Sequence, residues 1–196
     1  MSRPSDRARP PRAGLSTGKV VRTALDLLDD GAELTLSSVA ARLGVATPSL
    51  YKHVKGLEHL RELVAERCLR DMTATLGRAA VGRSGPDAVA ALLHAYRDYV
   101  LTHPHRYAAI PRDPLSRPVL AAAGQAQLDL CATALRSFHL EQDELIHQLR
   151  LLRAAVHGFA SLEAAGGFGL PQDVDESFTR LVQLHLADLT RRTEPS

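Results

Sequence analysis

The chain of 196 residues contains no tryptophan, and aromatic residues make up only 4% of it. Leucine, alanine and valine must therefore fill the core, and leucine and alanine favour helices strongly. No apolar, uncharged run reaches the roughly 18 residues of a membrane-spanning helix. The polar N-terminus also lacks the apolar segment of a secretory signal. We therefore expect a soluble protein of the cytoplasm with no membrane partner.

Cysteine is also scarce, since the chain has only two. Cys68 and Cys131 lie in apolar helical patterns, and their spacing fits neither a disulfide framework nor a zinc site. His103 and His105 flank Pro104, which would allow a metal site. With no cysteine or carboxylate at ligand spacing nearby, the motif favours a helix start at Pro104. We expect no metal and no cofactor.

Lysine is rare, and the positive charge is unevenly distributed. The net charge is +2. Residues 1–60 carry six arginines and three lysines against six acidic residues (+3), whereas residues 61–196 carry fifteen arginines against sixteen acidic residues (−1). Residues 1–14 hold four arginines and three prolines, too polar to form a core, and predict a flexible arm. That arm is either inert or contacts nucleic-acid phosphates.

Apolar residues recur at helical spacing along the rest of the chain, and no strand pattern persists. They predict an all-α protein of nine helices, the first three of them short. The expected ranges are 17–28, 36–43, 47–53, 57–76, 86–103, 104–111, a helix ending near 138, 141–165 and 174–191. We expect a domain of residues 15–60 after the arm, and a second domain of residues 61–196.

The second and third helices have the features of a helix-turn-helix. Gly44 can adopt the positive φ of a tight turn, and Ala40 is small enough for a close helix crossing. Val45 and Leu50 would seal the junction and leave the outer helix free to enter a DNA major groove about 12 Å wide. An ordinary polar helix face is the alternative. The exposed positions are Thr47, Ser49, Tyr51, Lys52 and His53.

The motif as a whole resembles the DNA-binding domain of the tetracycline-repressor (TetR) family. The similarity covers about residues 17–65. It rests on Thr35 to Ala40, Leu43-Gly44-Val45, Pro48-Ser49-Leu50-Tyr51, His53-Val54-Lys55 and Leu60. The resemblance implies a transcriptional regulator that binds a palindromic operator in double-stranded DNA.

The resemblance also implies individual roles in DNA binding. Thr35 and Ser37 lie near the start of the second helix at the DNA backbone, and Thr47, Ser49 and Lys52 face the groove. Pro48 contacts a thymine methyl, Tyr51 and His53 bind phosphate, and Lys55 binds the backbone. The family often has a lysine two residues after Lys55, where this chain has Leu57. Helix N-terminal amides are an alternative source of that phosphate contact.

The last two predicted helices are apolar on two sides, which requires two neighbours. A monomeric core is one explanation, and the resemblance implies instead a homodimeric four-helix bundle. The second apolar stripe of the first helix is Leu151, Ala155, Gly158 and Leu162. The stripes that we expect at the dimer interface consist of Leu145, Leu149, Leu152, Val156, Phe159, Phe178, Val182 and Leu186.

The fourth to seventh predicted helices are expected to enclose an effector pocket. Its candidate lining residues are aromatic or polar positions on otherwise apolar faces, and each is alternatively a core or surface residue. They are His94, Tyr96, Tyr99, Tyr107, Phe138 and His147. Residues 150–163 and 169–171 also resemble the branch of the family with a WHG-type C-terminal domain. His157 and Gly158 match its name, but its tryptophan is absent.

Three functions remain open at this point. The first is a repressor, associated with the bacterial nucleoid, that a small apolar effector releases from its operator. The second is a DNA-binding regulator without an inducer. The third is an enzyme using the histidines of the C-terminal half. The chain has no nucleophile elbow, phosphate-binding glycine loop or His-Glu metal motif, so we do not expect an enzyme.

Overall fold

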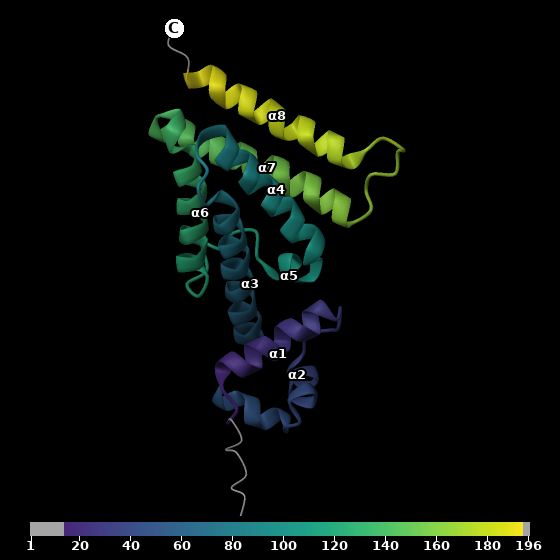
Figure 1. Ribbon diagram of the computed structural model, residues 1–196. Helices are drawn as coiled ribbons and strands as arrows, with labels where there is room; N and C mark the ends of the chain where they lie inside the picture. Colours follow the sequence, from purple (N-terminus) through teal and green to yellow (C-terminus); the bar gives the residue numbers. More distant parts are fainter. Residues whose placement is uncertain (1–13, 194–196) are drawn as a thin grey trace, which may run out of the picture.

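The computed structural model describes residues 14–193, which form eight α-helices and two short 3-10 helices with no strand in that range (Figure 1). The prediction of an all-α fold with short helices at the start is confirmed. The predicted arm of residues 1–14 lies, apart from Gly14, outside the described residues.

The N-terminal bundle consists of α1 (Thr17–Asp29), α2 (Leu36–Leu43) and the 3-10 helix η1 (Thr47–Lys52), at one end of the molecule (Figure 1). The helix starts are capped: the Ser16 side chain accepts a hydrogen bond from the Lys19 amide, and Thr35 and Ser38 form a capping box. We call its buried cluster, which the first half of α3 completes, the N-terminal core. It consists of Val20, Ala24, Leu25, Leu27, Val39, Ala40, Leu50, Val54, Leu60, Val64 and Cys68.

The turn between α2 and η1 forms as the sequence predicts. Gly44 ends α2 with φ of 68°, a left-handed conformation in which a Cβ is strained. The next element is a 3-10 helix rather than the predicted α-helix over 47–53. The Leu50 carbonyl accepts from the His53 amide at 2.8 Å and the Val54 amide at 3.0 Å, which closes the helix. A segment of six residues held by one buried leucine favours the tighter 3-10 turns used in short pieces.

The remaining helices form a C-terminal bundle that α3 joins to the N-terminal bundle (Figure 1). They are α3 (Leu57–Ala80), α4 (Gly85–Thr102), α5 (Pro104–Ala109), α6 (Ala121–Leu135) with the 3-10 helix η2 (Arg136–Phe138), α7 (Gln142–Ala164) and α8 (Val174–Thr193). Helix α3 is one turn longer than predicted, because it continues through Gly77 and the backbone turns only at Gly82, where φ is 72°.

A buried cation fixes the region of this bundle where α4 meets the end of α7 and the start of α8. Arg97 on α4 is only 7% exposed, and its guanidinium donates to Glu163 at 2.6 Å and to Asp175 at 2.6 Å. It also lies 4.9 Å from the centre of the Phe178 ring. These contacts tie α4 to the end of α7 and the start of α8. Since a buried charge without its partner is costly, the connection between α7 and α8 is held firmly.

Helix α5 lies where the two bundles meet. Ile110, the residue after it, packs against both hydrophobic cores. Arg106 on α5 donates two hydrogen bonds to Asp29 at the end of α1, the one from Nε at 2.6 Å, and its Nη1 is 3.7 Å from Asp71 on α3. This short helix is therefore bound to the N-terminal bundle on one side and to the C-terminal bundle on the other.

Candidate functional site

The outer surface of η1 presents a cluster of polar side chains on a buried apolar support. Leu50 and Val54 are buried, while Tyr51 is 59% exposed and Lys52 and Lys55 are also exposed. Pro48 and Ser37 are exposed as well, and Thr35, Thr47, Ser49 and His53 are half-buried. The structure thus gathers every predicted DNA-contact residue at the α2–η1 end of the N-terminal bundle.

Hydrogen bonds hold this surface to its neighbours. The Thr17 hydroxyl donates to the His53 carbonyl at 3.3 Å, which joins the start of α1 to the end of η1. Thr35 is engaged in capping α2, accepting from the Ser38 amide at 3.0 Å. Helix α3 begins after Gly56 without a side-chain cap. Its first-turn amides are therefore available to an anion.

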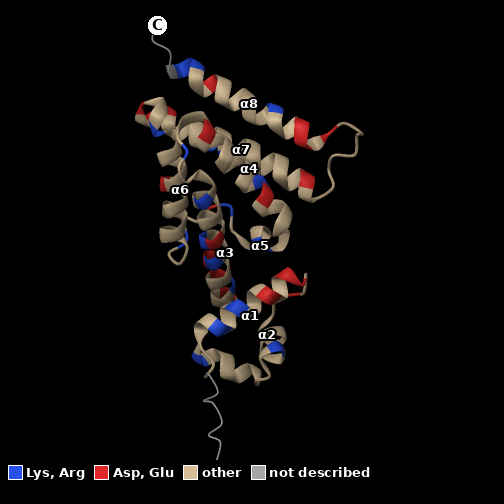
Figure 2. Cartoon of the chain, viewed as in Figure 1, with Lys and Arg blue, Asp and Glu red and all other residues tan. Residues whose placement is uncertain are grey.

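The charges of the N-terminal bundle are segregated. Its acidic residues gather toward the C-terminal end of α1 (Figure 2), where Asp29 pairs with Arg106 and Asp30 with Arg42. Within residues 14–193, neither Lys52 nor Lys55 forms an ion pair. Two unneutralised cations beside hydroxyl and aromatic groups are suited to phosphates, whose neutralisation releases counterions.

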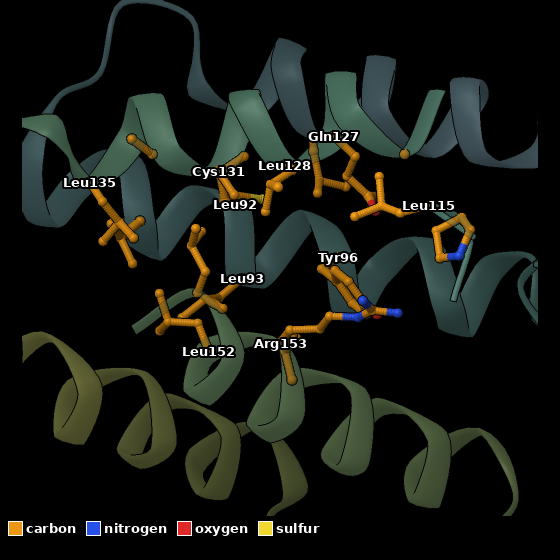
Figure 3. A pocket seen from close by; sticks show the side chains of 17 residues that line it. Leu92, Leu93, Tyr96, Leu115, Gln127, Leu128, Cys131, Leu135, Leu152 and Arg153 are labelled. Carbon is orange, nitrogen blue, oxygen red and sulfur yellow. The ribbon is translucent and has the colours of Figure 1, made fainter. Parts of the chain in front are cut away.

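A second candidate site is an elongated cavity of about 120 Å³ between α3, α4, α6 and α7 (Figure 3). Its walls are largely aliphatic: Leu76, Val89, Leu92, Leu93, Leu128, Leu135, Leu149, Leu152 and Val156. Burial raises the pKa of the Cys131 thiol in its wall to about 11, so this group is neutral at pH 7. The wall therefore offers a low-polarity environment.

A larger cavity of about 580 Å³ lies beside the first and reaches α5. The two share Tyr96, Pro114, Gln127 and Arg153 in their linings. The residues that α5 and its flanks contribute to the larger cavity are Pro104, His105, Tyr107, Ala108 and Ile110. A molecule bound across both cavities would touch the helix that contacts α1.

A chain of polar groups crosses the shared region. The Tyr96 and Tyr107 hydroxyls are 2.5 Å apart, and the Tyr107 hydroxyl is hydrogen-bonded to Nδ1 of His157. Burial, followed by the positive charges of Arg112 and Arg153, lowers the pKa of His157, so its imidazole is neutral at pH 7. Tyr107 can then donate to Nδ1 and accept from Tyr96.

The structure brings only part of the predicted pocket together. Tyr96 and Tyr107 line the cavities, but the other four predicted residues line neither. His94 is exposed and packs against Phe178, and the Tyr99 hydroxyl donates to the Cys68 carbonyl at 3.1 Å. Phe138 is buried in the core and His147 is exposed on α7.

Gln127, Cys131 and Arg153 also line the cavity, although the sequence pattern did not indicate them. Gln127 and Arg153 are polar positions on helices that also carry exposed polar residues, so nothing in the periodicity separates them from the surface. Burial of a polar atom without a partner marks one of them: Nε2 of Gln127 is buried with no hydrogen-bond acceptor.

Of the eight residues predicted for the dimer interface, four are buried inside the subunit and four are partly buried. Leu152, Val156, Phe178 and Val182 are buried, and Leu145, Leu149, Phe159 and Leu186 pack against the same core. The stripe of α7 left exposed is the second one, with Leu151 51% and Leu162 53% exposed, joined by Leu184 of α8 at 71%. Periodicity showed two apolar faces but could not tell which one the subunit itself covers.

Neither a metal site nor a membrane span appears within residues 14–193. This part of the chain has no group of three or more histidine, cysteine, aspartate or glutamate residues that could hold a metal ion. Pro104 occupies the first turn of α5, and the His103 ring packs against Tyr99. None of the helices described is long and apolar enough to cross a membrane.

The neutral state of His157 predicts a dependence of stability on pH. Its pKa is near 6.5 when unfolded and lower in the folded chain, so the unfolded chain binds more protons between these values. The free energy of unfolding should therefore fall as the pH decreases below about 6.5. Chemical denaturation at pH 7.5 and 5.5 should show a smaller loss for His157→Asn than for wild type. The exposed His147→Asn on the same helix is the control, and an equal loss in all three proteins would contradict the assignment.

The comparisons with known proteins agree with this architecture. Residues 89–185 match the family model of the tetracyclin repressor-like C-terminal domain. An uncharacterised HTH-type transcriptional regulator of Mycobacterium tuberculosis, Rv0681, is 37% identical over 95% of this chain and 86% of its own length. The narrower assignment to the WHG-type branch stays a prediction.

Two solved structures show the same fold at low sequence identity. BioQ with its natural double-stranded DNA operator has a TM-score of 0.68 and 21% identity, covering 90% of this chain and 98% of that one. A TetR variant from Acinetobacter baumannii in complex with minocycline has a TM-score of 0.71 and 20% identity, covering 93% and 100%. The chain has a helix-turn-helix, a matching C-terminal domain and a relative that aligns with 95% of its length. It therefore belongs to the TetR family of DNA-binding transcriptional regulators.

Proposed function

We propose that this regulator is a homodimeric repressor that a small molecule releases from a palindromic operator. One observation carries the proposal: adjacent residues of α5 contact the N-terminal bundle and the larger cavity. Arg106 is paired with Asp29 of the N-terminal bundle, while Tyr107 lines the larger cavity and bonds to His157. A molecule that displaces Tyr107 therefore acts on the helix that holds α1 in place. Such a repressor would work in the cytoplasm, at the nucleoid.

DNA contacts are assigned to the exposed end of the N-terminal bundle. Thr47, Ser49 and Lys52 face the major groove, and Pro48 contacts a thymine methyl. The phosphate contacts come from Tyr51, His53, Lys55 and the start of α2 with Thr35 and Ser37. The first-turn amides of α3 add a phosphate contact. The similarity in fold to BioQ, which was solved with its operator, supports this arrangement.

A dimer would form through the exposed stripe of α7 and α8. Leu151, Leu162 and Leu184 are large apolar side chains in contact with solvent, and Ala155 and Gly158 between them allow close approach. A two-fold axis brings the same surface of both subunits together. Two N-terminal bundles could then occupy successive major grooves, whose centres are about 34 Å apart.

Effector release then follows from a shift in population. A dimer with the spacing that fits the operator is in equilibrium with one that does not, and a ligand that binds the second form better lowers operator affinity. The loss equals the difference in ligand affinity between the two forms. The fold shared with a TetR bound to minocycline supports a ligand site in this bundle.

The two exposed lysines should differ in their effect on DNA binding. Lys55→Ala should weaken binding to all sequences alike and lower the slope of log affinity against log salt by about 1, because one phosphate contact is lost. Lys52→Ala should change sequence preference if Lys52 contacts a base. Fluorescence anisotropy with selected and scrambled duplexes at several salt concentrations measures both. Arg180→Ala, an exposed α8 position, is the control, and unchanged binding in both lysine variants would refute this surface.

Charge in the exposed stripe should dissociate the dimer. Leu151→Glu and Leu184→Glu each place a carboxylate in an apolar contact, which would be costly to desolvate without a partner. Sedimentation equilibrium should show a dimer for the wild type and a monomer for either variant. Leu170→Glu, 80% exposed in the loop after α7, should stay dimeric. A monomeric wild type would contradict the proposed assembly.

The proposed function is tested by separating ligand binding from operator release. Operator fragments are selected from genomic DNA with the full-length protein, and compounds that raise its melting temperature are then added to the complex. Such compounds should release the wild type, whereas Arg106→Gln should bind them equally well and show a smaller fold-loss of operator affinity. Arg180→Gln, which breaks an exposed ion pair on α8, is the control. Stabilising compounds that leave operator affinity unchanged would refute the proposal.

A further inference from the structure

We infer that the cavity accepts an amphipathic anion: an apolar chain or ring in the narrow cavity, with a single carboxylate-type head at Arg153, Gln127 and Arg112. The inference rests on the proposed function in treating these cavities as the effector site. It goes further by naming the chemical class of the ligand.

The cavity is polarised along its length. Figure 3 shows Leu135, Leu93 and Leu152 toward one end, and Tyr96, Gln127 and the Arg153 guanidinium toward the other, near Leu115. An apolar group in the aliphatic end gains about 25 cal/mol for each Å² of its surface removed from water. A polar group placed there would find no partner. The orientation of a ligand is therefore set, with its polar end at Arg153.

The polar end offers one buried donor that lacks an acceptor, beside two exposed arginines, Arg153 and Arg112. Nε2 of Gln127 is buried and has no partner. Arg153 donates to the Arg112 carbonyl at 2.5 Å, but a guanidinium has five N–H groups. Across residues 14–193, neither Arg153 nor Arg112 is ion-paired. The nearby carboxylate of Asp113 accepts from the Ser116 amide. A ligand that supplies acceptors and negative charge would satisfy this end.

The neighbouring hydroxyls do not change this requirement. Tyr96 can donate to Tyr107 and Tyr107 to Nδ1 of His157, so the two phenol protons are engaged. The proton of neutral His157 is then on Nε2, which is one more donor that calls for an acceptor. The lowered pKa of His157, to which both arginines contribute, agrees with a positive potential here. A cationic head would be repelled, and a neutral hydroxyl would leave the guanidinium charge unpaired. A carboxylate can pair with Arg153 through two hydrogen bonds.

The test compares three ligands with the same ten-carbon chain. Decanoate, 1-decanol and decylammonium, each below its micelle concentration, are titrated into full-length protein by calorimetry. Decanoate should bind about tenfold tighter than decanol, as expected for a charge-assisted hydrogen-bonded pair, and decylammonium should bind most weakly. Equal affinity for decanoate and decanol would overturn the inference about the head group.

Variants locate the head group. Arg153→Gln and Arg112→Gln should each weaken decanoate binding, Arg153→Gln by about tenfold, and leave decanol binding unchanged. Arg150→Gln, an exposed position on the same helix, should alter neither, and circular dichroism checks that each variant is folded. Loss of decanoate and decanol binding in equal measure would overturn the assignment, as would no loss in either variant.

The outcomes separate this inference from the proposed function. If decanoate binds with the expected preference but leaves operator affinity unchanged, the pocket chemistry stands and effector release fails. If a neutral or cationic compound releases the operator while decanoate does not bind, release stands and the anion inference fails.

Discussion

The contact between α5 and α1 is the interaction on which the rest of this molecule depends. Arg106 holds Asp29 through two hydrogen bonds, and Ile110 packs against both hydrophobic cores. Without this contact, α3 would be the main link between the bundle that carries η1 and the bundle that encloses the cavities. Because Tyr107 follows Arg106 directly, a change at the cavity and a change at α1 involve adjacent residues of α5.

The C-terminal bundle combines a fixed part and a part with unsatisfied groups. Arg97 is buried and is bonded to Glu163 and Asp175. It therefore fixes the end of α7 against the start of α8, the two helices through which subunits are proposed to meet. Gln127, by contrast, has a buried donor without an acceptor beside a cavity, next to the exposed Arg153. Arg97 is buried and paired, whereas Arg153 is exposed beside the cavity and forms no ion pair within residues 14–193, which leaves it open to a charged ligand.

The fold and the exposed polar surface of η1 could be predicted because they depend on local signals. Gly44, Pro48 and the caps Ser16 and Thr35 act within a few residues, and apolar periodicity identified the buried residues of α1 and α2. The pocket and the dimer surface depend on which faces meet in three dimensions. Leu152 and Leu151 are both apolar residues of α7, and only packing shows that the first is buried and the second exposed. Likewise, Arg153 resembles any surface arginine until its neighbours are known.

The central claim is that the cavity and the N-terminal bundles move together in a dimer. It is tested most directly by the distance between two spin labels at Ala41→Cys, an exposed position on α2, with Cys68 and Cys131 replaced by alanine. Pulsed electron–electron double resonance measures that distance in the free dimer, with operator, and with decanoate. We predict that operator selects the spacing set by grooves about 34 Å apart and that decanoate shifts the distribution away from it. Identical distributions with operator and with bound decanoate would contradict the account.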